Sequence, residues 1–360
     1  MAEISLRRLT KRFGTVAAVH DLSLTLASGE LVALLGPSGC GKTTTLRMIA
    51  GFESPTQGRV LLADRDVTEA PPEDRNCGMV FQNYALFPHL TVHQNVSFGL
   101  QMRKVPRAAI GPRVDEILAR VGLGGLGHRY PRQLSGGQQQ RTALARALVI
   151  NPSVLLLDEP LANLDAKLRE EMRFFIRSLV REFHITTLYV THDQAEALVL
   201  ADRVAVLIEG VLQQFDTPEA VYRRPRTVRV ASFIGLTNLI PGRVTAHSAD
   251  RLVLETGIGP LRAHGPADLR DGMDALLSLR PETIELGTRG PAAPGDGANH
   301  LRGIVRERAF LGSLFDYRVD VGGGTLLRVQ SGVTAVHQVE DEVTVSFQPA
   351  AGWVLPGGGG

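Results

Sequence analysis

The feature that most constrains this chain is a glycine-rich loop placed directly after a short apolar run. The run is Leu31–Leu35, and Gly36–Thr43 follow it with the pattern G-x-x-x-x-G-K-T. Glycines let successive backbone N–H groups turn toward one anion, and a helix that begins there adds its positive end. Because the helical stretch Thr43–Ala50 follows, the sequence predicts a phosphate-binding loop between a buried strand and a helix. A glycine-rich turn without any ligand is the alternative.

The composition excludes several other kinds of protein. The 360 residues are 44% hydrophobic and 21% charged, which is ordinary for a folded chain of two domains. A net charge of +2 is too small for a nucleic-acid-binding field. Cys40 and Cys77 are the only cysteines, so we expect a reducing compartment without disulfides. We find neither a signal peptide nor an apolar run that could span a bilayer, so we expect a partner to provide any contact with membranes.

The first part of the chain, residues 1–236, alternates short β-rich runs with helical patterns. The clearest helical pattern is Asp165–Phe183, whose apolar residues recur at helical spacing and whose Asp165 can cap its N-terminus. This alternation predicts an α/β fold with a mainly parallel sheet. The predicted strands are Leu31–Leu35, Val154–Leu157, Ile185–Val190 and Val204–Ile208.

The second part, residues 237–356, consists of short β-like pieces separated by glycine and proline turns. This pattern predicts a small barrel or sandwich. We expect Gly287–Asn299 to be a loop between two β-rich halves and Gly357–Gly360 to be a disordered tail. The β-like pieces are Gly242–Thr245, Leu252–Glu255, Ala275–Leu279, Gly303–Glu307, Asp316–Val321, Leu326–Val329 and Glu342–Phe347.

Two acidic residues follow the apolar strand Val154–Leu157. Asp158 and Glu159 then lie at the C-terminal edge of a sheet, where α/β proteins bind their ligands. At that edge Asp158 can hold Mg²⁺ through water, beside the Thr43 hydroxyl, and Glu159 can polarise an attacking water. A strand followed by a solvated acidic turn is the alternative, and the phosphate-binding loop upstream disfavours it.

A third motif, Leu134-Ser135-Gly136-Gly137-Gln138, opens the predicted helix Gly136–Ile150. Ser135 and Gln138 have the spacing of a capping box, which any helix can use. A capping box does not require two glycines between its members. Because residues without side chains leave the first amides of the helix open to an anion, we favour anion binding here.

In this order, with a lone Gln82 and a late His192, these motifs resemble the ATP-binding subunit of an ABC transporter over residues 4–235. The second part resembles the transport-associated OB-type domain of importers for maltose, polyamines, ferric iron, sulfate or molybdate. The resemblance implies a P-loop α/β domain over residues 1–236, with a helical subdomain at about 88–150, and a small all-β OB-like domain over 237–356. The motifs of the second part are Asn238-Leu239-Ile240-Pro241-Gly242, Leu279-Arg280-Pro281-Glu282 and Phe310-Leu311-Gly312-Ser313.

The resemblance implies ATP and Mg²⁺ as cofactors and a role for each matching residue. Phe13 would stack on adenine, and a core aromatic is the alternative for it. Gln82 would ligate Mg²⁺, as would Thr43 and Asp158, and would sense the membrane partner. The catalytic residues would be Lys42, Gln82, the base Glu159 and His192, which contacts the γ-phosphate. The phosphate-binding positions are Ser38, Gly39, Cys40, Gly41, Lys42, Thr43 and Thr44.

In the family, the residues that match Ser135, Gly137 and Gln138 contact the ATP held by the opposite subunit. The resemblance therefore implies a head-to-tail homodimer, and Asp165 belongs to the shared site. Ala162 stands where the family usually has a serine, which removes one cross-subunit hydrogen bond worth about 0.5–1.5 kcal/mol. We expect weaker coupling between the two sites rather than a loss of turnover.

The resemblance also implies partners. Two transmembrane permease subunits would dock near Gln82–Leu90, whose apolar residues are otherwise hard to explain at a surface. Leu86 and Phe87 would belong to the chain's own core in the alternative interpretation. An extracytoplasmic substrate-binding protein would take part indirectly and nucleic acid would not. The chain would be a peripheral subunit at the cytoplasmic face of the inner membrane.

The implied function is ATP hydrolysis that powers the import of a solute. The sequences of Ala166–Phe183 and Gly235–Gly242 resemble most the polyamine and ferric-iron group of importers. One alternative is a soluble ABC ATPase that acts on ribosomes or DNA. Another is a regulatory binding module, in which the β-rich part senses a ligand or a partner protein.

Overall fold

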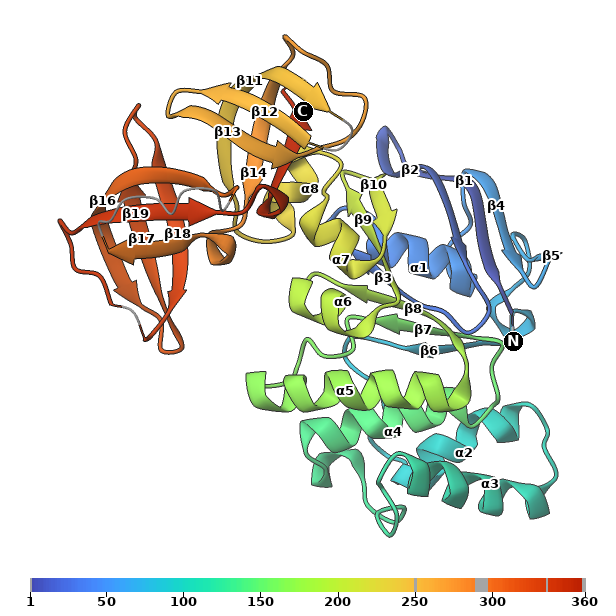
Figure 1. Ribbon diagram of the computed structural model, residues 1–360. Coiled ribbons are helices and arrows are strands. Elements are labelled where there is room, and N and C mark those ends of the chain that lie inside the picture. Colours follow the sequence, from blue (N-terminus) through green and yellow to red (C-terminus); the bar gives the residue numbers. More distant parts are fainter. Residues whose placement is uncertain (1, 249–250, 289–296, 335, 358–360) are drawn as a thin grey trace. The chain divides into compact units, whose positions relative to one another are not determined.

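The computed structural model describes residues 2–248, 251–288, 297–334 and 336–357. The chain forms two compact units, Met1–Pro218 and Glu219–Gly360, hereafter the first and the second unit (Figure 1). The domain boundary between residues 236 and 237 stays a prediction. In the described residues, no helix is both long enough and apolar enough to cross a membrane.

The first unit is built around a six-stranded sheet in the order β10-β9-β3-β8-β7-β6. Its neighbours are parallel except for the antiparallel pair of β9 and β10. All residues of β3 and β7 are buried, because helices or strands cover both faces, and this explains their unbroken apolar runs. The four predicted strands are confirmed to within one residue. The strands are β3 (Leu31–Leu35), β6 (Cys77–Val80), β7 (Val154–Asp158), β8 (Thr186–Thr191), β9 (Arg203–Ile208) and β10 (Val211–Asp216).

A second sheet of the first unit, in the order β2-β1-β4-β5, is antiparallel. The sequence analysis does not predict it, so the expected mainly parallel sheet describes only the six-stranded one. Register shifts interrupt the pairing of β1 with β2 and break the alternation of apolar and polar residues that would reveal these strands. The strands are β1 (Ile4–Phe13), β2 (Val16–Leu26), β4 (Gln57–Leu62) and β5 (Arg65–Asp66).

The predicted helix after Asp165 is confirmed, and the Asp165 carboxylate caps it by accepting a hydrogen bond from the amide of Leu168 at 2.9 Å. The predicted helix after Ser135 begins at Gly136 as expected but ends at Leu148, two residues early. The helices of the first unit are α1 (Lys42–Ala50), α2 (Val92–Met102), α3 (Arg107–Arg120), α4 (Gly136–Leu148), α5 (Ala166–Phe183) and α6 (Gln194–Leu200), with 3₁₀ turns at Pro72–Asp74 and Pro131–Gln133.

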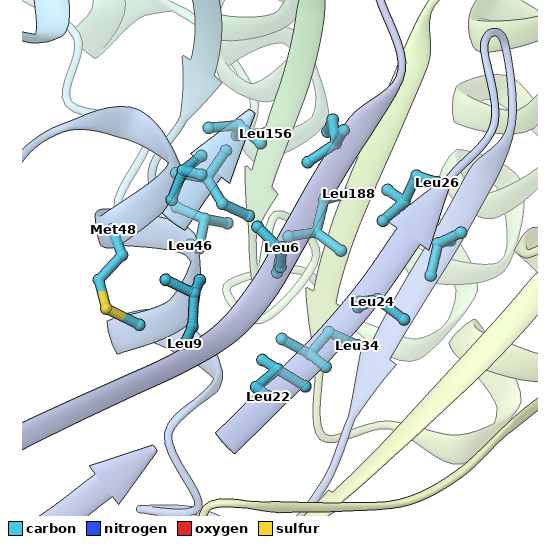
Figure 2. Close-up of a cluster of buried hydrophobic side chains, with 14 of the residues drawn as sticks. Leu6, Leu9, Leu22, Leu24, Leu26, Leu34, Leu46, Met48, Leu156 and Leu188 are labelled. Atoms are coloured by element: carbon cyan, nitrogen blue, oxygen red, sulfur yellow. The ribbon is translucent and has the colours of Figure 1, made fainter. Parts of the chain in front are cut away.

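One hydrophobic core joins the two sheets of the first unit to α1. Figure 2 shows Leu6 and Leu9 of β1 beside Leu46 of α1, and Leu22 of β2 beside Leu34 of β3. All five side chains are at most 2% exposed. Burial of this apolar surface fixes the end of β3 against the start of α1, which is where the glycine-rich loop lies.

The second unit contains a closed barrel in the order β11-β12-β13-β20-β14 and a five-stranded sheet in the order β15-β19-β16-β17-β18. The predicted β-like pieces are all confirmed, apart from Val321 just beyond the end of its strand, whereas β13, β15 and β20 were not predicted. The elements are α7 (Pro218–Arg223), α8 (Val228–Phe233), β11 (Asn238–Ser248), β12 (Arg251–Thr256), β13 (Gly259–His264), β14 (Asp274–Leu279), β15 (Glu285–Thr288), β16 (Asn299–Phe310), β17 (Leu314–Asp320), β18 (Leu326–Gly332), β19 (Glu342–Phe347) and β20 (Gly352–Pro356), with 3₁₀ turns at Pro281–Thr283 and Pro349–Ala351.

The expected loop Gly287–Asn299 is shorter than predicted. Gly287 and Thr288 pair with β19 as part of β15, and Asn299 begins β16. Residues 289–296 of that loop lie outside the described residues. So do residues 358–360 of the expected tail.

Candidate functional site

The glycine-rich loop joins β3 to α1, as predicted. Gly41 is the residue before the helix and has a φ of 99°, a conformation that residues with a side chain rarely adopt. A Cβ atom on Gly41 would also lie 2.3 Å from the carbonyl oxygen of Ala18. A close approach of backbone to backbone therefore requires glycine here, and it leaves the first amides of α1 uncovered by a side chain at the N-cap.

Lys42 is held inside this loop. Its Nζ donates hydrogen bonds to the carbonyl oxygens of Gly36 and Pro37, at 2.8 and 2.9 Å, and its side chain is almost fully buried. The Cys40 sulfur lies 3.9 Å from the same nitrogen, and burial raises the pKa of that thiol. The thiol therefore stays neutral, and Lys42 is the cationic group that the loop presents to an anion.

Thr43 and Asp158 meet across the end of the sheet. The Thr43 hydroxyl donates to Oδ1 of Asp158 at 3.1 Å. Burial raises the pKa of the Asp158 carboxyl, the Thr43 hydrogen bond opposes this, and the neighbouring Glu159 adds to it. A hydroxyl and a carboxylate are hard oxygen donors, and Mg²⁺ that also binds substrate phosphates needs only one or two protein carboxylates. These residues fit Mg²⁺, although in the described residues no three His, Cys, Asp or Glu side chains form a metal cluster.

Glu159 and His192 form a second pair at the same edge. Because β7 and β8 are parallel neighbours, the residues that follow their C-terminal ends lie side by side. His192 Nδ1 lies 3.0 Å from Oε2 of Glu159. Glu159 has a φ of 44°, which is strained for a residue with a side chain, and its amide donates to the carbonyl of Val190. The Glu159 carboxylate thus contacts the histidine from a backbone conformation that surrounding contacts must hold.

Two further predicted residues lie at the surface. Gln82, in the turn after β6, is exposed, and its carbonyl accepts a hydrogen bond from Nδ2 of Asn163 at 2.7 Å. Phe13, the last residue of β1, is 51% exposed, and Nζ of Lys11 lies 5.0 Å from its ring centroid. The alternative that Phe13 is a core aromatic is therefore wrong. Its free face can stack on a planar ring.

The motif that opens α4 does form the capping box. Ser135 Oγ accepts from the amide of Gln138, and the side chain of Gln138 accepts from the amide of Ser135. A Cβ atom on Gly136 or on Gly137 would lie 3.1 Å from the side chain of Leu164 or of Leu168, respectively, so close packing gives a second reason for the doubled glycine. Figure 1 shows α4 apart from α1, with strands of the sheet and α5 between them in this view.

The structure thus gathers most of the predicted residues at one edge of the sheet and keeps one group away from it. The first group is the glycine-rich loop with Lys42 and Thr43, joined by Asp158, Glu159 and His192. In the part of the chain that the structure describes, no hydrogen bond joins the start of α4 to this edge. Within the described residues of one chain, the start of α4 is therefore not part of the hydrogen-bonded group at this edge.

Comparison with known proteins gives a consistent result. Residues 19–162 match the family model described as ABC transporter, and residues 277–355 match the model of the TOBE domain. The spermidine/putrescine import ATP-binding protein PotA of Chromobacterium violaceum is 43% identical over 99% of both chains. The Fe(3+) ions import ATP-binding protein FbpC of Agrobacterium fabrum is 45% identical over 94% of this chain and 93% of that protein. The chain belongs to the ATP-binding subunits of ABC importers.

A solved structure agrees with this assignment. A dimeric, post-hydrolysis state of an ATP-binding cassette bound to ADP and Pi is similar to this chain with a TM-score of 0.53 and 33% identity. The similarity covers 60% of this chain and 98% of that cassette. The predicted P-loop α/β fold, the additional β-rich domain and ATP binding are therefore confirmed for this ABC subunit.

The surface proposed for the permease contains both exposed and packed residues. In this ABC subunit Leu86 and Phe87 are half-buried, and the Phe87 ring lies 4.7 Å from that of Phe98, centroid to centroid. Leu86 and Phe87 therefore keep an exposed part, and the docking of a permease on this surface stays a prediction.

One polar group near His192 was not predicted from the sequence. Glu196 is buried, and its Oε2 accepts hydrogen bonds from the hydroxyls of Tyr189 and Thr191, both at 2.8 Å. Asp193 caps α6 by accepting from the amide of Glu196. The signal in the sequence was an acidic residue three positions after a capping aspartate, which alone indicates a helix start rather than a buried network. In this ABC subunit the residues on either side of His192, Thr191 and Asp193, are thus both held by hydrogen bonds with Glu196.

Proposed function

We propose that this subunit hydrolyses ATP to power the import of a polyamine or of ferric iron. The observation that carries the proposal is the pair of contacts at one sheet edge, Thr43 with Asp158 and Glu159 with His192. The relatives named above import spermidine and putrescine or Fe(3+) ions, and their names support a cationic cargo. They favour an importer over the alternatives of a ribosome- or DNA-acting ATPase and of a regulatory binding module.

The loop residues Ser38–Thr44 hold the phosphates in this proposal, and Lys42 supplies positive charge to the phosphate oxygens. Phe13 stacks on the adenine. Mg²⁺, held by Thr43, Asp158 and Gln82, would neutralise charge on the β- and γ-phosphates. Lys42 must leave at least one loop carbonyl to reach the phosphates, because both of its hydrogen bonds now point into the loop.

Glu159 acts as the general base. Its carboxylate accepts a proton from the water that attacks the γ-phosphorus, in line with the bond to the leaving ADP oxygen. His192, within hydrogen-bond distance of Glu159, orients that carboxylate and contacts the γ-phosphate. Because the Glu159 backbone is strained, its side chain is already aimed before the nucleotide binds.

Ser135, Gly137 and Gln138 complete the site of a second copy in a head-to-tail homodimer, to which Asp165 also contributes. The separation of α4 from the loop supports this arrangement, and so does the dimeric state of the similar cassette. Ala162 supplies no hydroxyl at the junction, so we expect weaker coupling between the two sites. Loss of the γ-phosphate on hydrolysis would let the two chains separate.

Two permease subunits dock near Gln82–Leu90, where Leu86 and Phe87 keep an open face. The chain would then be a peripheral subunit at the cytoplasmic face of the inner membrane, and a substrate-binding protein would deliver the cargo from the other side. The ATP-binding domain is proposed to comprise residues 1–236, with its helical subdomain at about 88–150, and the OB-like domain residues 237–356.

The test is purification of the tagged chain from detergent-solubilised membranes, followed by ATPase assays in proteoliposomes. Permease subunits that co-purify would support the proposal, and ribosomes or DNA in their place would overturn it. Polyamine-loaded and Fe³⁺-loaded binding protein are then compared in the same vesicles. Stimulation of ATP hydrolysis by one of the two identifies the cargo, and stimulation by neither contradicts the proposed cargo class.

A further inference from the structure

The turn that carries Gln82 has a strained backbone. Tyr84 and Ala85 both have positive φ, 60° and 47°, in succession and without a glycine. Such a conformation persists only where surrounding contacts hold it. The amide of Tyr84 donates to the carbonyl of Phe81, and that of Ala85 to the carbonyl of Asn83. These local bonds leave the carbonyls of Gln82, Tyr84 and Ala85 to be satisfied from elsewhere.

Arg146, in the last turn of α4, satisfies two of them. One guanidinium nitrogen donates to the carbonyl of Ala85 at 2.7 Å, and the other terminal nitrogen donates to that of Tyr84 at 2.8 Å. The guanidinium carbon lies 5.5 Å from the centroid of the Phe87 ring. A planar cation with two parallel donors thus spans the strained pair. The helix that provides it begins at the Ser135 motif.

Asn163 satisfies the third carbonyl. Its Nδ2 donates to the oxygen of Gln82 at 2.7 Å. Asn163 lies four residues after Glu159, in the loop that joins β7 to the Asp165 cap of α5. Next to it stands Ala162, where a cross-subunit hydroxyl is expected in this family. In the loop after Glu159, the side-chain amide of Asn163 therefore bonds within its own chain, to the Gln82 turn.

We infer that Arg146 and Asn163 are positioning residues, which fix the main chain of the Gln82 turn so that the Gln82 side chain can reach Mg²⁺. The inference rests on the proposed function, because it takes Gln82 as a metal ligand. The affinity for Mg²⁺·ATP then depends on two other functional segments. These are the helix α4, which follows Ser135, and the loop that follows Glu159. Neither residue touches the nucleotide in this account.

The experiment measures binding of a fluorescent ATP analogue to the full-length chain, with Mg²⁺ and with EDTA. In Asn163→Ala we expect binding to weaken about 3- to 10-fold with Mg²⁺, the effect of one lost hydrogen bond, and to stay unchanged with EDTA. Asn163 is exposed, so this variant should fold. Arg146→Gln should show the same split, and Arg146→Lys should recover part of the Mg²⁺ effect, because lysine keeps a charged donor.

Arg141 offers a matched control. It lies on the same helix, donates to the carbonyl of Val121 at 3.0 Å and stacks over the Phe175 ring, away from the Gln82 turn. Arg141→Gln should change binding equally with Mg²⁺ and with EDTA, or not at all. Equal losses under both conditions in Asn163→Ala, or parent-like Mg²⁺ binding in both Asn163→Ala and Arg146→Gln, would overturn the inference. Failure of the proposed Mg²⁺ site is distinct, because the parent chain itself would then bind ATP equally with Mg²⁺ and with EDTA.

Discussion

The two units of this chain treat backbone strain differently. Among the described residues, twelve non-glycine residues of the first unit have positive φ, among them Glu159, Tyr84 and Ala85, against Glu340 alone in the second unit. In the second unit the turns that need positive φ use glycine, as at Gly259 and Gly312. The first unit therefore tolerates this strain more often, and three of the strained residues, Glu159, Tyr84 and Ala85, lie at its candidate site or in the Gln82 turn.

Buried polar groups differ in the same way. In the first unit Asp158 and Glu196 bond to other side chains at the ends of strands. In the second unit Asn238 exchanges two hydrogen bonds with the backbone of Arg328, and Arg280 donates to the carbonyls of Ala231, Leu236 and Tyr222. Asp158 lies in the candidate site, whereas Asn238 and Arg280 satisfy buried backbone groups, as Arg75 also does in the first unit. Substitutions in the candidate site should change ATP binding or hydrolysis, whereas substitutions of the buried polar residues of the second unit should change the free energy of unfolding.

The largest effect is expected for Glu159→Gln. The variant should bind ATP like the parent chain and hydrolyse it about 10²- to 10⁴-fold more slowly, because glutamine cannot accept the proton of the attacking water. Parallel measurements of nucleotide binding and phosphate release check this. Hydrolysis at the parent rate would remove Glu159 from the role of base.

Lys42→Ala should weaken ATP binding by about 10- to 100-fold, because it removes a charge-assisted hydrogen bond to phosphate. It should have little effect on the unfolding of the second unit. Isothermal titration with ATP, together with a thermal melt, measures both. An ATP affinity equal to the parent's would contradict the assignment of the phosphate-binding loop.

Arg280→Ala tests the other side of the comparison. It leaves the buried carbonyls of Ala231, Leu236 and Tyr222 without their donor, at a cost of about 1–3 kcal/mol in the free energy of unfolding. Denaturant unfolding of the full chain gives the loss, and ATP binding should stay at the parent level. Impaired ATP binding without a stability loss would break the division between the units.

Glu196→Gln should give the smallest effect, seen in the pH dependence of stability. Burial raises the pKa of Glu196 above its usual 4.5, so the folded chain binds this proton more tightly than the unfolded chain. The parent's unfolding free energy therefore carries a contribution that falls as pH rises above about 4.5 toward the raised folded pKa. The variant, which keeps an oxygen acceptor for Tyr189 and Thr191, lacks that fall. Denaturant unfolding at several pH values should show the variant gaining on the parent as pH rises.

The sequence predicted those elements of the fold whose pattern does not depend on distant partners. Four parallel strands, β3, β7, β8 and β9, and the helix α5 have apolar runs or helical periodicity, and they were located to within one residue. The parallel strand β6 was not predicted. The antiparallel sheet was missed because bulges in β1 disturb its alternation. β13 and β20 were missed because no local sequence pattern indicates that the barrel closes. The closure pairs distant residues, such as Ser278 with Trp353.

The site was predicted as a set of motifs rather than as contacts. The expectation that Asp158 and Glu159 stand at a ligand-binding edge agrees with where the structure places them, beside Thr43 and His192. The burial of Glu196 and the bonds of Arg146 to the Gln82 turn could not be predicted. Each of these contacts joins residues from different segments of the chain. A glutamate near a helix start or an arginine near a helix end does not require such a partner, so the sequence gives no sign of it.

The proposed mechanism requires a nucleotide that is shared by two chains. Sedimentation of Glu159→Gln with Mg²⁺·ATP tests this most directly, since the variant should trap the bound state. We predict a species of about twice the 38.9 kDa chain with ATP and of one chain with ADP. A particle of single-chain mass with ATP bound would contradict the account.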